Sequence, residues 1–327
     1  MSIPSMRALA SGIAIVAALA ACSKHEETPA PAASAPAPAA AATAAAPKAT
    51  NAHAFTIGEL SAYALRDGSL EFPNDNKIFA LGRTAEETSA LLTAHGLPTD
   101  TLHFSVQPLL VKTADKVLLF DTGAAGSFGP GAGRLPGSLA EAGLDPAKVT
   151  DIFISHLHGD HVGGLVDAQG ALAFPNATIH LQKAEWKFMQ EVKEDMAKAM
   201  GLGTRDAMVA AMKPKVDAFA AGAELVPGTV TAVDIKGHTP GHSGYRITSG
   251  TQTLLYVGDS MHHFVISVRK PDWPVAFDGD QATSAKSRAK LIADSAASGQ
   301  RIFSVHFPFP GIGTFEKKGD GYVWVAE

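Results

Sequence analysis

The sequence predicts a mixed α/β fold, and three observations carry that prediction. Short apolar runs typical of strands recur along the chain. Segments with helical apolar spacing lie between them, and such interleaving is typical of the α/β class. With 46% hydrophobic and 18% charged residues, the 327-residue chain also excludes a wholly disordered, collagenous or multi-pass membrane protein.

The expected elements follow in chain order. Strands are predicted at 55–65, 104–112, 116–121, 151–155, 177–182, 229–235, 244–248, 253–258, 301–306 and 322–326. Helices are predicted at 138–143, 183–200, 204–220 and 284–299, and Pro214 interrupts the third. The Gly- and Pro-rich segment 123–137 is expected to be a loop over one edge of the sheets, where loops usually border sites.

Residues 1–22 are expected to be a lipoprotein-type signal peptide. A positively charged start up to Arg7 precedes an apolar run, 8–21, that is shorter than the about 20 residues of a bilayer crossing. The letters LAAC, which end at Cys22, resemble a bacterial lipoprotein signal, and an ordinary signal peptide with a chance cysteine is the alternative. Ser23 resembles the outer-membrane sorting pattern. We therefore expect export and anchoring at the bacterial cell envelope through lipidated Cys22, on the outer membrane facing the periplasm.

The rest of the chain divides into a tether and one large domain. Residues 23–52 are rich in Ala and Pro and are expected to be a disordered tether, while 53–327 form the folded domain. The formal net charge of −5 does not favour a nucleic-acid surface. Cys22 is the only cysteine, so any metal site in the domain must consist of His, Asp or Glu side chains.

A dense group of metal-binding residue types follows the predicted strand 151–155. It reads His-Leu-His-Gly-Asp-His over 156–161. Imidazole nitrogens and carboxylate oxygens are good zinc ligands, and a tight loop after a rigid strand can direct several of them inward. Further histidines and an aspartate follow later predicted strands, in the segments GHTPGHS (237–243), LLYVGDS (254–260) and FSVHFPFPG (303–311).

This ordered set resembles the metallo-β-lactamase-fold hydrolases, and the resemblance extends from about residue 55 to the end. It implies an αβ/βα four-layer sandwich and two zinc ions per subunit, although Mn, Fe or Co suit the same donors. One zinc would be bound by His156, His158 and His242, the other by Asp160, His161 and His306, with Asp259 bridging the two. A water shared by the metals would supply the nucleophilic hydroxide.

Two further residues are implied to support the ligands. Asp121, in the segment LFDTG, would orient a ligand from behind, although a turn residue explains it equally well. In the resemblance the second histidine of GHTPGH is the ligand, which leaves His238 as a supporting or turn residue.

Within the superfamily, the segments LLFDTGAAGSFGPGAGRL and HFPFPGIG resemble the methyl parathion hydrolase and lactonase-like subfamily. Phe128 and Phe188 would line the substrate pocket, with Trp186 as an alternative to Phe188. Trp186 and Phe188 could instead form the buried side of a helix. Asp160 and His262 are the predicted catalytic residues. His262 would protonate the leaving alkoxide, and His263 is its competitor.

The predicted activity is hydrolysis of lactones or aryl esters, with organophosphate triesters as the alternative. A β-lactamase, a thioesterase and a non-catalytic zinc-binding lipoprotein are less favoured, since all seven ligand positions are filled and the fold's β-lactamases generally lack the bridging aspartate. The expected partners are a small ester or lactone and the membrane, with a homodimer left open.

Overall fold

The computed structural model describes residues 50–327. The predicted signal peptide, Cys22 and the tether up to residue 49 lie outside this part of the chain. Among the described residues, no helix is both long and apolar enough to cross a membrane. Ala52, placed in the tether by the sequence, already begins a strand.

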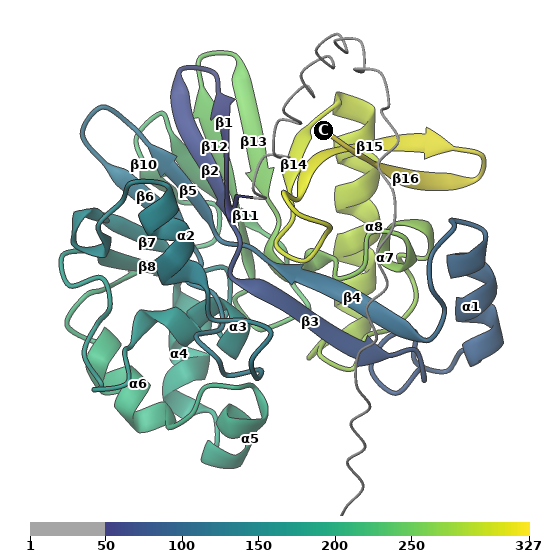
Figure 1. Ribbon diagram of the computed structural model, residues 1–327, viewed down its shortest axis with the longest axis horizontal. Coiled ribbons are helices and arrows are strands. Elements are labelled where there is room, and N and C mark those ends of the chain that lie inside the picture. Colours follow the sequence, from purple (N-terminus) through teal and green to yellow (C-terminus); the bar gives the residue numbers. More distant parts are fainter. Residues whose placement is uncertain (1–49) are drawn as a thin grey trace, which may run out of the picture. The chain divides into compact units, whose positions relative to one another are not determined.

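Two seven-stranded sheets are formed within residues 50–327 (Figure 1). The first has the order β1-β2-β5-β6-β7-β8-β9, and β6 to β9 run parallel to one another. Its strands are β1 (Ala52–Ile57), β2 (Leu60–Leu65), β5 (Leu109–Lys112), β6 (Val117–Phe120), β7 (Asp151–Phe153), β8 (Thr178–Gln182) and β9 (Val216–Phe219).

The second sheet follows chain order from β10 to β16, and only its β13 and β14 pair in parallel. Its strands are β10 (Glu224–Val226), β11 (Val230–Asp234), β12 (Ser243–Ser249), β13 (Gln252–Tyr256), β14 (Arg301–Phe303), β15 (Ile312–Lys318) and β16 (Gly321–Ala326). A separate hairpin pairs β3 (Gly68–Pro73) with β4 (Thr101–Val106).

Helices cover the outer faces of both sheets. They are α1 (Ala85–Thr93), α2 (Leu135–Glu141), α3 (Gly159–Val162), α4 (Lys183–Glu191), α5 (Glu194–Ala199), α6 (Arg205–Met212), α7 (Ile266–Arg269) and α8 (Gln281–Ser298), with short 3-10 turns at Pro146–Lys148, Gly163–Leu165 and Gly258–Ser260. One core lies between the sheets around Phe120, Phe153 and Tyr245. A second packs α2, α4 and α6 on the first sheet, and a third packs α8 on the second sheet. This layering confirms the predicted αβ/βα sandwich.

Several elements differ from the sequence prediction. The strand predicted at 55–65 is the hairpin β1–β2, and 104–112 divides between β4 and β5 of different sheets. The helix predicted at 204–220 ends at Met212, and 216–219 is strand β9, because Pro214 cannot continue a helix. The helix predicted at 183–200 is the pair α4 and α5.

Candidate metal centre

The predicted ligand loops meet at one edge of the two sheets. The chain leaves β7 at Phe153 and runs through the His156–His161 segment into α3. This loop packs tightly, since a Cβ atom on Gly159 would lie 2.3 Å from the carbonyl oxygen of Gly201. The segments that follow β11, β13 and β14 bring further histidines and Asp259 to the same place.

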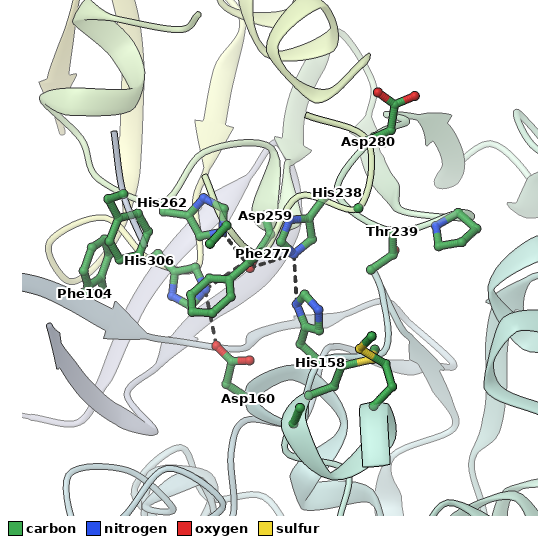
Figure 2. A pocket seen from close by; sticks show the side chains of 18 of the residues that line it. Phe104, His158, Asp160, His238, Thr239, Asp259, His262, Phe277, Asp280 and His306 are labelled. Carbon is green, nitrogen blue, oxygen red and sulfur yellow. Dashed lines mark hydrogen bonds and ion pairs between the residues drawn. The ribbon is translucent and has the colours of Figure 1, made fainter. Parts of the chain in front are cut away.

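The first group of side chains joins three histidines to Asp259. Nδ1 of His158 lies 2.9 Å from Nε2 of His156 and 2.9 Å from Nε2 of His238. Those two Nε2 atoms are 3.2 Å apart, and Oδ2 of Asp259 lies 3.4 Å from His238 Nε2. Four potential ligand atoms therefore converge on one point, and Figure 2 shows His158, His238 and Asp259 of this group.

The second group joins Asp160, His161 and His306. Oδ2 of Asp160 lies 3.6 Å from His161 Nε2 and 3.4 Å from His306 Nε2. Oδ1 of Asp259 lies 3.1 Å from His161 Nε2 and 3.0 Å from His306 Nε2. Asp259 thus directs one carboxylate oxygen to each group, which is the position that a bridging ligand requires.

The chemistry of this cluster fits two divalent cations. Burial, reinforced by neighbouring histidines, holds the pKa of His156 and His158 well below the ordinary value, so these imidazoles are neutral and present lone pairs. Three imidazole nitrogens this close cannot all satisfy one another by hydrogen bonds. Nε2 of His161 and Oδ1 of Asp259 are buried without a hydrogen-bond partner within residues 50–327. Cations between these atoms would satisfy them all.

The structure differs from the prediction at the histidine of GHTPGH. His238, rather than His242, lies in the first group. Both ring nitrogens of His242 are engaged by the backbone: Nδ1 donates to the carbonyl of Ile235 at 2.8 Å, and Nε2 accepts from the N–H of Asp259 at 3.0 Å. These two contacts hold the His242 ring beside the backbone of Asp259.

Asp121 lies directly behind a predicted ligand. Its Oδ2 is 2.7 Å from Nδ1 of His161 and accepts hydrogen bonds from the hydroxyls of Ser155 and Tyr256, each at 2.6 Å. Its Oδ1 accepts from the backbone N–H of Ser155 at 2.7 Å. These contacts orient the His161 ring so that its Nε2 faces Asp160 and Asp259.

A second buried chain of contacts supports His238. Nδ1 of His238 lies 2.9 Å from Asp278 Oδ1, and the guanidinium of Arg288 donates to Asp278 Oδ2 at 2.8 Å. Arg288 also donates from Nε to the carbonyl of Ser260, next to Asp259, at 2.8 Å. Burial opposes protonation of His238, yet its hydrogen bonds to Asp259 and Asp278 raise its pKa to about 9. A metal must therefore displace a proton from this ring.

Glu185 of α4 joins two ligand loops from behind. It is fully buried and accepts hydrogen bonds from the backbone N–H groups of Leu157 at 3.0 Å and Gly241 at 2.7 Å. Burial raises the pKa of this carboxyl to about 6 although both hydrogen bonds favour the charged form. Leu157 lies between His156 and His158, and Gly241 lies three residues after His238, so Glu185 connects the two segments that supply the histidines of the first group.

Five of these side chains line a cavity of about 920 Å³ (Figure 2): His158, Asp160, His238, Asp259 and His306. Phe79, Phe104 and Phe277 form one aromatic wall, with Phe79 and Phe104 stacked at 4.6 Å. Phe128 and Phe188 also line this cavity, together with Met196 and Met200. Trp186 does not line the cavity and packs on the core beneath α4.

The structure separates the two adjacent histidines that the sequence left in competition. His262 lines the cavity, and its Nε2 lies 3.3 Å from Asp259 Oδ2. His263 points away, with Nδ1 accepting from the backbone N–H groups of Val265 and Ile266.

Sequence reasoning missed Glu185, Asp278 and Arg288. Glu185 and Arg288 lie in predicted helices, and a charged residue on the buried face of a helix was the available signal. Asp278 lies in a loop, where no periodicity marks an inward-facing side chain.

Comparison with known proteins agrees with this geometry. Residues 103–297, more than half of the chain, match the family model of the metallo-beta-lactamase superfamily, to which the chain therefore belongs. A solved structure described as AidC, a dizinc quorum-quenching lactonase in complex with a product, is 32% identical with a TM-score of 0.78. That match covers 85% of this chain and 98% of AidC.

Of two curated relatives, one matches only a short segment of this chain and the other matches at lower sequence identity. The ribonuclease Z of Salinibacter ruber is 42% identical over 73 residues, which is 22% of this chain and only 19% of that protein. The N-acyl homoserine lactonase of Bacillus cereus is 26% identical over 214 residues, 60% of this chain and 79% of the relative. The superfamily is thus shown, while the predicted methyl parathion hydrolase subfamily remains a prediction.

Proposed function

We propose that this protein is a dinuclear metal-dependent hydrolase that opens lactones, with zinc in both sites. The convergence of seven His and Asp side chains, six of them buried, beside an apolar cavity carries this proposal. The similarity to the dizinc lactonase AidC and to the B. cereus lactonase supports lactones over other esters.

When bound, two such metals polarise the carbonyl of the substrate and lower the pKa of a water that attacks it. His156, His158 and His238 would hold one ion, Asp160, His161 and His306 the other, and Asp259 both. The chain itself fixes these positions, because Asp121, Asp278 and Glu185 hold the ligands from behind.

His262 contributes a hydrogen-bond donor at the cavity wall. Burial lowers its pKa, although Asp259 opposes this, so the imidazole is neutral at pH 7. Its ring lies parallel to that of His306, with centroids 5.9 Å apart and planes 11° apart. Both of its ring nitrogens are buried without a hydrogen-bond partner within residues 50–327. Its N–H would therefore be available to a substrate oxygen in the cavity and would stabilise the leaving alkoxide.

The apolar walls suit a substrate with a hydrocarbon part. Phe79, Phe104, Phe277, Phe128 and Phe188 all line the cavity that His158, Asp160 and Asp259 also line. Burial of methylene groups there contributes roughly 0.8 kcal/mol each. An N-acyl homoserine lactone combines a lactone ring with such a chain.

The test is kcat/KM of the zinc-loaded enzyme on a matched panel: an N-acyl homoserine lactone, dihydrocoumarin, an aryl acetate and a dimethyl aryl phosphorothioate. We expect a lactone to lead, and rates to rise with acyl length until the chain fills the cavity. A lead of orders of magnitude for the phosphorothioate would overturn the proposal in favour of organophosphate hydrolysis. A His262→Phe variant with two zinc ions and unchanged turnover would eliminate the role of His262.

We also propose that the chain is exported and anchored through a lipidated Cys22. The observation behind this proposal is the LAAC pattern at the end of the apolar run. Cell fractionation of the full chain and of a Cys22→Ser variant tests it. Membrane association in the first and release of the second are expected, and equal solubility of both would contradict it.

A further inference from the structure

A second cavity, of about 270 Å³, lies on the other side of strand β4 from the metal centre. Arg66, Arg134, His103 and His263 provide its side-chain nitrogen atoms, while Phe104, Phe264 and Phe309 provide apolar surface. Phe104 lines both cavities. No Asp or Glu lines the second cavity within the described chain.

The two arginines have unused hydrogen-bonding capacity. The guanidinium of Arg66 lies 4.2 Å from the ring centre of Phe309, which covers one face and leaves its edge free. Its Nε is buried without a hydrogen-bond partner. Neither Arg66 nor Arg134 forms a salt bridge with any residue in 50–327.

Nearby carboxylates are occupied elsewhere. The oxygens of Asp67, next to Arg66, accept from the backbone N–H groups of Ala124, Gly133 and Leu135 at 2.9 to 3.1 Å. Glu71 lies 3.3 Å from Nδ1 of His103 at the edge of the cavity. The positive charge of the two guanidinium groups therefore faces the cavity without a counter-charge.

His263 adds a buried donor. Only 5% of the residue is exposed. Its Nδ1 accepts from two backbone N–H groups, at 3.2 and 3.3 Å, so the proton of the neutral ring resides on Nε2. Nε2 has no hydrogen-bond partner within residues 50–327, and the ring lines the cavity.

We propose that this cavity binds a small organic anion, with its carboxylate or phosphate group between Arg66, Arg134 and His263 and its apolar part against Phe104, Phe264 and Phe309. A guanidinium edge matches two oxygens of such a group, and an aromatic face behind the arginine holds that edge in place. The mixture of cationic and aromatic lining favours an anion with a hydrocarbon body over a bare inorganic ion.

The site is separate from the catalytic cavity but adjacent to it. Ser105 of β4 lines the second cavity, and its carbonyl oxygen lies 2.8 Å from Nδ1 of His306 in the metal centre. Binding of the anion is therefore expected not to compete with substrate.

The experiment is calorimetric titration of the full-length zinc-loaded enzyme with benzoate, benzyl alcohol and inorganic phosphate. Benzoate should bind more tightly than phosphate, and neutral benzyl alcohol should not bind this site. Arg66→Gln and Arg134→Gln should each weaken benzoate binding about tenfold or more, the effect of losing a charge-assisted contact. Arg83→Gln, whose guanidinium lies 5.5 Å from the ring centre of Trp273, is the matched control and should bind like the wild type.

Hydrolase activity and melting temperature of each variant show whether it is folded. Arg134 is exposed, so Arg134→Gln serves as the test if Arg66→Gln does not fold. Benzoate bound at the metal centre would persist in the arginine variants and compete with substrate. Equal affinity in the wild type and Arg134→Gln, or no benzoate binding at millimolar concentration, would overturn the proposal.

Discussion

Residues 50–327 contain two clusters in which histidines lie against aspartates, and the two clusters differ in how their polar atoms pair. At the start of β7, Asp151 lies 2.9 Å from Nε2 of His180 and 2.8 Å from Nζ of Lys116, and Asp217 lies 3.4 Å from the other ring nitrogen of His180. The contacts of Asp151 join donors to an acceptor, whereas Nδ1 of His180 is buried without a hydrogen-bond partner within residues 50–327. We call this set the structural cluster and the two groups around Asp259 the metal cluster.

In the metal cluster, several of the closest contacts join two imidazole nitrogens rather than a donor and a carboxylate. Nε2 of His156 and His238 lie 3.2 Å apart, and both lie 2.9 Å from Nδ1 of His158. The histidines repel one another when protonated, whereas His180 has a carboxylate on each side. A His and Asp cluster thus indicates a cation site when its lone pairs converge, and a structural role when its donors and acceptors pair.

The largest contrast is expected from removing one histidine of each cluster. His238→Ala should lower kcat/KM about a thousandfold or more, because a bound metal supplies several kcal/mol of transition-state stabilisation. His180→Ala should leave kcat/KM of the folded enzyme unchanged while lowering its stability. Steady-state kinetics and thermal unfolding of both variants check this, and equal losses of activity would refute the distinction.

Removing Asp278 or Arg288, which hold His238 in place, should have a smaller effect, and it should appear as weaker zinc binding. We expect Asp278→Asn and Arg288→Gln to weaken zinc binding about 10- to 100-fold, as is typical for residues behind a ligand. Competition with a fluorescent chelator measures the affinity. Asp151→Asn is the matched control, because it removes a buried aspartate beside a histidine in the other cluster. Unaltered zinc affinity in Asp278→Asn would show that the ring of His238 needs no such support.

The structural cluster is expected to make the free energy of unfolding depend on pH, through Asp151. Burial opposes ionisation of Asp151, yet hydrogen bonds from His180, Lys116 and Thr150 hold its pKa well below the ordinary value. Stability from this depressed pKa is present above about pH 4 and is lost as the pH falls through that range toward the folded-state pKa. Asp151→Asn should cost about 1 kcal/mol at pH 7 and less below pH 4, measured by urea unfolding. A pH-independent difference would contradict the assignment.

The smallest change in stability and zinc affinity is expected from a substitution on the exposed face of α8. Lys290 and Asp294 form an exposed pair one turn apart, only two residues from buried Arg288. Lys290→Ala should change stability by less than about 0.5 kcal/mol and leave zinc affinity unchanged. Chemical unfolding and chelator competition check both, and a loss comparable with that of Arg288→Gln would remove the distinction between the two faces.

The pattern of strands and helices predicted only the α/β class, and the family resemblance implied the layers and six of the seven side chains that converge in the structure. The His156–His161 segment could be identified from the sequence because three histidines and an aspartate rarely occur within six residues. The segment GHTPGH contains two histidines, and the resemblance implied His242 as the ligand. The structure instead places His238 in the first group and hydrogen-bonds both ring nitrogens of His242 to the backbone of Ile235 and Asp259. Strand β9 was mistaken for helix because its short segment follows Pro214 within a helical apolar pattern.

The most direct measurement is anomalous diffraction at the zinc edge from crystals of the zinc-loaded enzyme. Two peaks are expected, one among His156, His158 and His238 and the other among Asp160, His161 and His306. Asp259 should contact both, and His242 neither. A single peak, no peak in these positions, or zinc bound to His242 in place of His238 would contradict the account.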